Sequence, residues 1–107
     1  MTTKPITDKA EVSIDFPDKF YMGSFGRESL LEVTADDQGA HITLERKGEQ
    51  SRRVAFHLHH YLLADLIEAL GQEIAAAKAP DEVHRDRLER AVQTLAKAVR
   101  PRRKRHK

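Results

Sequence analysis

The stretch AHITLERKGEQSRRVAFHLHHYLLADLIEALGQEIAAAK, residues 40–78, decides the fold of this chain. In its first half apolar residues alternate with polar ones, at Ile42 and Leu44 and again at Val54 and Phe56. A period of two predicts two strands, each with one buried and one solvated face, and the glycine-bearing segment KGEQ between them predicts a hairpin turn. From HLHH onwards apolar residues recur every three or four positions, which predicts an amphipathic helix.

Shorter runs upstream repeat the alternation. Three further strands are predicted at residues 12–16, 20–22 and 31–35. The segment DDQG, residues 36–39, predicts a turn, and GSFG, residues 23–26, predicts a turn or bulge whose glycines adopt unusual dihedral angles. Residues 1–9 are polar with an early proline, and they predict a disordered leader.

A second helix is expected after Pro80, which interrupts the helical pattern, with Asp81 suited to cap it. Within residues 80–99 apolar residues recur at spacings of four and three, which predicts a narrow seam that packs on the same domain or on a partner. The predicted fold class is therefore α+β. An antiparallel curved sheet of four to five strands and a long amphipathic helix occupy residues 10–79, and a second C-terminal helix follows.

The charges of the chain are unevenly distributed. It has 19 basic and 17 acidic residues, but the last eight residues, RPRRKRHK, contain six basic and no acidic ones. The rest has 13 basic and 17 acidic residues, so a body of net charge −4 precedes a tail of +6. The tail, residues 100–107, is expected to be disordered. There is no cysteine, no apolar N-terminal run and no apolar segment of membrane-spanning length, so a cytoplasmic protein is expected.

The order of strands and helix resembles that of PUR repeats, Whirly proteins and the positive-cofactor-four type of coactivator. The resemblance lies in FYMGSFGRESLLEVTADDQGAHITLERKGEQSRRVAFHLHHYLLADLIEAL, residues 20–70. The chain is similar in particular to small bacterial PUR-type proteins, which have an aromatic opening strand, a glycine-containing turn followed by a basic residue, and two hairpins before the helix. The resemblance implies a homodimer that binds single-stranded DNA or RNA on its sheet. The surface that it implies consists of Tyr21, Phe25, Arg27, Arg46, Lys47, Arg52 and Arg53.

Two basic clusters support this interpretation. Arg46, Lys47, Arg52 and Arg53 flank one hairpin turn, where they suit phosphate contacts that position a strand without reading its sequence. Alternatively they form a solvated hairpin whose charges discourage edge pairing. The tail cluster consists of Arg102, Arg103, Lys104, Arg105 and Lys107. It binds nucleic acid or an acidic partner, or it serves only as a solubilising end.

Three histidines form a candidate metal site. His57 and His59 point to the same side if the strand persists to residue 59, and His41 approaches them across the hairpin. Three imidazoles on one face suit zinc or nickel. The alternative is a set of surface histidines at a strand-to-helix junction, because no cysteine or suitably spaced acidic residue accompanies them. No cofactor is expected.

No arrangement of residues predicts an enzyme. GSFGRES lacks the Lys-Ser/Thr pair of a phosphate-binding P-loop, and neither Ser24 nor Ser29 has the context of a catalytic nucleophile. Phe25 is either an exposed stacking ring or a residue of the core. Two functions remain: a protein that binds single-stranded nucleic acid through its sheet, basic hairpin and tail, or a protein-interaction module that assembles through its helices. No small-molecule substrate and no membrane association are expected.

Overall fold

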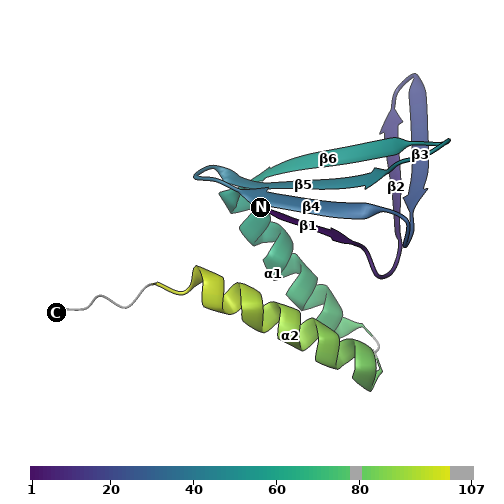
Figure 1. Cartoon of the computed structure of the whole chain (residues 1–107). Coiled ribbons are helices and arrows are strands. Elements are labelled where there is room, and N and C mark those ends of the chain that lie inside the picture. The colour runs from purple at the N-terminus through teal and green to yellow at the C-terminus, as the bar shows by residue number, and fades with distance from the viewer. Residues whose placement is uncertain (78–80, 102–107) are drawn as a thin grey trace. The chain divides into compact units, whose positions relative to one another are not determined.

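Six antiparallel strands precede two helices in the computed structural model of the chain, which describes residues 1–77 and 81–101 (Figure 1). The strands are β1 (Thr2–Pro5), β2 (Ala10–Phe16), β3 (Lys19–Phe25), β4 (Leu30–Ala35), β5 (Gly39–Arg46) and β6 (Arg52–His59), and the helices are α1 (His60–Ala76) and α2 (Glu82–Val99). This order confirms the predicted α+β class. The chain divides into two units, Met1–Ala69 and Leu70–Lys107. Pro80 and the predicted tail residues from Arg102 onwards lie outside the described residues.

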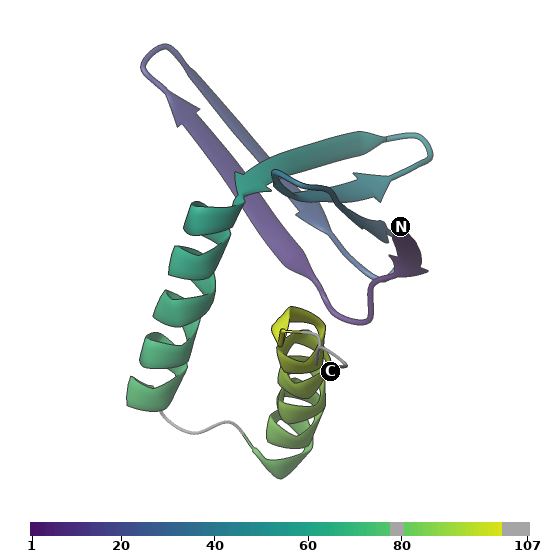
Figure 2. The ribbon, with the colours of Figure 1, turned by 90° about the vertical axis from the view of Figure 1, so that its left-hand side faces the viewer.

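The strands form two sheets where a single sheet of four to five strands was predicted. One has the order β1-β4-β5-β6, and the other is the hairpin of β2 and β3. Figures 1 and 2 show this hairpin running across the direction of the four strands. Sequence periodicity identifies strands but carries no information about which strands pair, so the separation into two sheets was not predictable from it.

The N-terminal residues also differ from the prediction of a disordered leader. Thr2–Pro5 is strand β1, which pairs antiparallel with β4 so that Thr2 lies opposite Val33 and Pro5 opposite Leu30. The segment TTKP has no apolar alternation. Its strand conformation comes from backbone pairing with the edge of β4, which leaves no signal in side-chain pattern.

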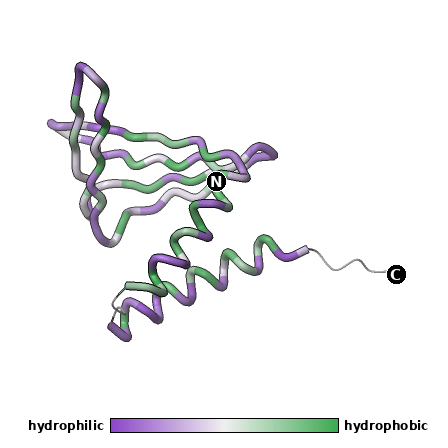
Figure 3. The backbone as a smooth tube through the Cα atoms, turned by 180° about the vertical axis from the view of Figure 1, so that it is seen from behind, coloured by the Kyte–Doolittle hydropathy of each residue, from purple (hydrophilic) through white to green (hydrophobic). Residues whose placement is uncertain are grey.

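The four-stranded sheet has one apolar and one polar face, as the alternation predicted. A row on one face consists of Val33, Ile42 and Phe56, and the adjacent row on the other face consists of Thr34, His41 and His57. Figure 3 shows the same alternation of hydrophobic and hydrophilic residues along the strands. Because side chains alternate between faces, the polar face collects the histidines that the sequence singled out.

Both hairpin turns of this sheet lie where the sequence predicted them, and each contains a glycine with positive φ, Gly39 at 156° and Gly48 at 115°. The prediction for GSFG was wrong. Gly23, Ser24 and Phe25 belong to β3, the turn follows at residues 26–29, and neither Gly23 nor Gly26 has a positive φ. Gly23 lies next to the side chain of Arg52, with which a Cβ at this position would make an ordinary van der Waals contact at 3.5 Å.

Little of the described chain is buried. Phe25, 3% exposed, is the one buried hydrophobic residue of residues 1–77 and 81–101. Neither α1 nor α2 has a buried residue, although apolar residues recur along both helices (Figure 3). Asp81 caps α2 as predicted, because its side chain accepts a hydrogen bond from the backbone N–H of His84. Neither helix is long and apolar enough to cross a membrane.

Candidate functional site

Two groups of polar residues lie at opposite ends of the four-stranded sheet. Arg46 pairs with Arg52 beside the β5–β6 turn, and Gly39 pairs with His59 at the other end of the same two strands. We call the first group, Arg27, Arg46, Lys47, Arg52 and Arg53, the basic end. We call the second, Asp36, His41, His57 and His59, the histidine end. The sheet thus separates the predicted phosphate contacts from the predicted metal ligands.

The basic end brings together cations from two turns. Leu30 pairs with Glu45, so the turn before β4, which carries Arg27, lies at the same end of the sheet as the β5–β6 turn. An ion pair joins the two turns, from Arg46 Nε to Glu28 Oε1 at 3.5 Å. Glu28 therefore offsets part of the positive charge, and Arg27, Lys47 and Arg53 remain exposed.

Arg52 connects the basic end to the β2–β3 hairpin. Its Nη1 donates a hydrogen bond to the backbone oxygen of Ser24 at 3.1 Å, and its Nε and Nη2 donate to Gln50 at 3.3 Å each. The side chain passes next to Gly23 of β3. Arg52 is therefore held in place, and its main role is to position the hairpin.

A groove of about 460 Å³ lies between this hairpin and the start of β6. Tyr21, Met22, Arg52 and Arg53 are among its lining residues. The Tyr21 ring is 52% exposed and meets the ring of Phe16 edge-on, with centroids 6.3 Å apart. An exposed aromatic face beside a cationic side chain is an arrangement that stacks a base and contacts its phosphate.

Phe25 lines this groove from within the core. The sequence left open whether its ring stacks on a ligand or fills the core, and at 3% exposure it fills the core. A base has no access to a ring that is covered on both faces. The surface that the resemblance to PUR-type proteins implies therefore includes one ring that is buried.

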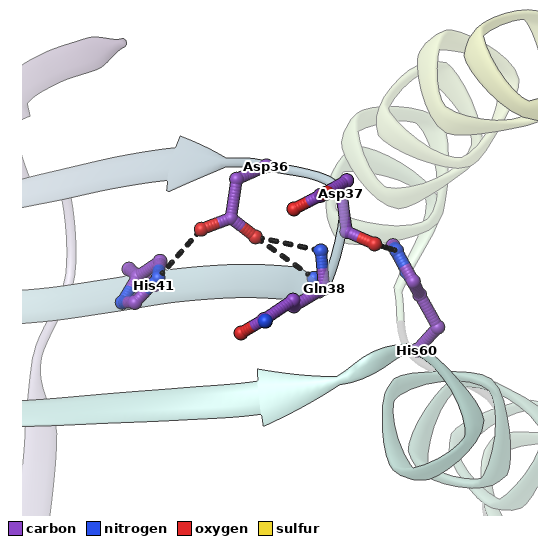
Figure 4. A network of polar contacts seen from close by, with 6 residues as sticks. Asp36, Asp37, Gln38, His41 and His60 are labelled. Carbon is purple, nitrogen blue, oxygen red and sulfur yellow. Dashed lines mark hydrogen bonds and ion pairs between the residues drawn. The ribbon is translucent and has the colours of Figure 1, made fainter.

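The histidine end is built on the β4–β5 turn (Figure 4). Asp36 Oδ1 accepts hydrogen bonds from the backbone N–H groups of Gln38 and Gly39, at 2.9 and 3.1 Å. Its other oxygen, Oδ2, lies 3.1 Å from His41 Nε2. These contacts lower the pKa of the Asp36 carboxyl, with the Gln38 N–H the largest cause and His41 the next.

The three predicted histidines lie together on the polar face. His41 and His57 are cross-strand partners whose rings stack at 3.8 Å between centroids and 15° between planes. The rings of His57 and His59 follow at 4.4 Å and 33°. His60 lies apart from this set, because its Nε2 contacts the backbone oxygen of Asp37 at 3.2 Å (Figure 4).

Asp36 is the residue that sequence analysis missed, since it was assigned to the turn alone. It follows Thr34 by two positions, and Thr34 pairs with His41. Asp36 is therefore a diagonal neighbour of His41 on the polar face. The register of the DDQG hairpin places Asp36 beside His41. Spacing along the chain alone does not show this proximity.

A second aspartate–histidine pair lies on α2. His84 Nδ1 is 2.8 Å from Asp81 Oδ1, and the bonds from His84 lower the pKa of Asp81. Within the described residues no third acidic or histidine side chain joins this pair to form a cluster with the geometry of a metal site. The pair belongs to the N-terminal cap of α2. It therefore provides a control for experiments on the aspartate and histidines of the histidine end.

Comparison with known proteins adds no homologue: no protein-family model, curated protein or solved structure matches this chain. The geometry of the two ends is therefore the basis on which a function can be proposed.

Proposed function

We propose that this chain binds single-stranded DNA or RNA at the basic end. The observation that carries the proposal is the groove in which exposed Tyr21 lies beside Arg52 and Arg53. Tyr21 stacks on a base, Arg53 contacts a phosphate, and Arg52 holds the groove open through its bond to Ser24. The role is one of binding, and no residue of this end is assigned to catalysis.

The basic tail adds affinity in this proposal. Its cations neutralise phosphates at any position along a strand, which strengthens binding without sequence preference. The body has an excess of acidic residues, so most of the attraction over long distances comes from the tail. The groove then determines how a strand is seated.

A salt titration with a fluorescent single-stranded oligonucleotide separates these contributions. For single strands the slope of log affinity against log salt is about −0.7 per neutralised phosphate. We expect replacement of the tail cations by serine to reduce the slope while binding persists at low salt. Loss of all binding in that variant would contradict a site on the sheet.

The helices favour assembly as a second candidate function, in which the chain serves as an interaction module or forms a homodimer. Leu70 on α1 is 51% exposed and Leu88 on α2 is 46% exposed, and both belong to rows of apolar residues. Exposed rows of this kind mark surfaces that bind other proteins. Sedimentation of the wild-type chain and of Leu88→Glu tests the candidate: we expect an oligomer that the substitution dissociates, and a wild-type monomer at all concentrations would exclude self-assembly.

A further inference from the structure

We propose that Asp36, His41 and His57 bind a divalent transition-metal ion, with zinc the best match, and that His59 supplies a fourth ligand. One candidate ligand atom from each of the first three residues lies within 4.8 Å of the others. These residues come from the β4–β5 turn, β5 and β6, so the folded sheet rather than a local motif assembles them. The three residues lie at the end of the sheet away from the basic end, and Arg53 lines both their hollow and the groove.

The ligand atoms of Asp36 and His41 are separated by nearly the distance expected for two atoms that bind the same ion. Two ligands each about 2.0–2.1 Å from zinc lie roughly 3.3 Å apart at a tetrahedral angle. Asp36 Oδ2 and His41 Nε2 are 3.1 Å apart. The other carboxylate oxygen accepts the two backbone hydrogen bonds of the turn, so Asp36 is held in place while Oδ2 faces the site.

His57 needs a small rotation to complete the set. Its ring is nearly parallel to that of His41, whereas imidazoles that share an ion direct in-plane lone pairs to one point. His57 is exposed and His41 is half-buried, so rotation about their Cβ–Cγ bonds meets little packing. His59 lies next to His57 on the same face. A rotation of its ring in the same sense brings a nitrogen toward the ion.

The surroundings leave room for an ion and its water. Asp36, His41 and His57 line a hollow of about 510 Å³ on the polar face, together with Thr34 and Thr43. Imidazole nitrogens with one carboxylate suit zinc, nickel or copper, while calcium and magnesium prefer oxygen ligands. The donor set therefore predicts selectivity against the two hard cations.

Calorimetric titration of the untagged, full-length chain with zinc chloride tests the proposal. We expect one zinc ion at this site, a loss of affinity of about tenfold or more in His57→Gln and Asp36→Asn, and no binding of magnesium. Asp36→Asn is informative because asparagine Oδ1 still accepts the hydrogen bonds of the turn. The matched control is His84→Gln. It removes an exposed histidine whose Nδ1 lies 2.8 Å from Asp81 Oδ1, and it leaves all four proposed ligands in place.

Absorption of the cobalt(II) complex gives a second readout, because the intensity of its visible d–d bands reports the coordination number and geometry of the bound ion. We expect the bands in wild-type protein and in His84→Gln and their loss in His57→Gln. If His57→Gln does not fold, paramagnetic shifts of the wild-type His41 and His57 ring protons by cobalt decide instead. Unchanged zinc affinity in both site variants, or shifts confined to other histidines, would overturn the proposal.

Discussion

The two ends of the four-stranded sheet show how one pair of strands supports opposite chemistries. At the histidine end, Asp36 is fixed by backbone bonds and lies in a cluster with His41 and His57. At the basic end, Arg52 is fixed by a bond to the β2–β3 hairpin while Arg53 stays exposed. Each end thus has one side chain held by the backbone and others left for a ligand. The proposed ligands differ: a small cation at one end and a polyanion at the other.

The largest effect is expected from removing Phe25, the buried residue of β3, which we expect to anchor the β2–β3 hairpin beside the basic end. Phe25→Ala replaces the one buried hydrophobic residue of the described chain and is expected to lower the free energy of unfolding by about 3 kcal/mol. Phe20→Ala is the matched control, because Phe20 lies on the same strand but is exposed, and we expect it to cost less than about 1 kcal/mol. Urea denaturation measures both, and equal losses would show that Phe25 is not an anchor.

Gly39 plays the corresponding part at the histidine end. A Cβ at this position would overlap the backbone of Leu58 and His59, and the φ of 156° disfavours any side chain. Gly39→Ala should lower the free energy of unfolding by about 2 kcal/mol. Gly71→Ala on α1 is the control: its Cβ would meet no described atom within 4 Å, and the helix should gain up to about 1 kcal/mol. A neutral Gly39→Ala would show that β6 does not approach the turn so closely.

Arg53 allows a test of the basic end without unfolding it. Its side chain is exposed, so Arg53→Ala should leave stability unchanged and reduce the salt slope of oligonucleotide binding by about 0.7. Arg87→Ala removes the same charge from α2 and is the control. If both substitutions weaken binding equally, net charge rather than the groove determines affinity.

The smallest effect concerns the pH dependence of the histidine end. The pKa of Asp36 lies below the ordinary 3.8, chiefly because Gln38 N–H binds the carboxylate. A folded-state pKa below the unfolded one stabilises the fold above about pH 4, and this stabilisation is lost as pH falls through the lowered value. We expect the stability difference between wild type and Asp36→Asn to shrink from about pH 5 to about pH 2 in urea titrations. A difference that grows with acidity would contradict this assignment.

The sequence predicted the elements better than their assembly. Alternation identified β5 and β6, and the change of period placed the start of α1 at His60, because burial of one face leaves a direct pattern in side chains. β1 was missed because its strand conformation depends on pairing with β4, and the separate β2–β3 sheet was missed because pairing depends on long-range geometry. The end of β3 was misplaced because a glycine pair was taken as the sign of a turn, whereas Gly23 has no positive φ and continues the strand.

The candidate sites show the same division. The basic residues flanking one turn were expected to lie together, since a hairpin brings its two ends into contact, and they do. His41 and His57 were expected to meet across that hairpin, and they do. Asp36 contacts His41 across the adjoining turn, and Phe25 is buried next to β6; periodicity along a single strand encodes neither contact.

The most direct test of the account is one NMR titration of the isotopically labelled full-length chain, first with zinc and then with a single-stranded oligonucleotide. We predict that zinc shifts the amide signals of residues 36–41 and 57–59, whereas the oligonucleotide shifts those of residues 21–23 and 46–53. Shifts from both ligands at one end of the sheet, or oligonucleotide shifts confined to residues 100–107, would contradict the division of the sheet into two binding ends.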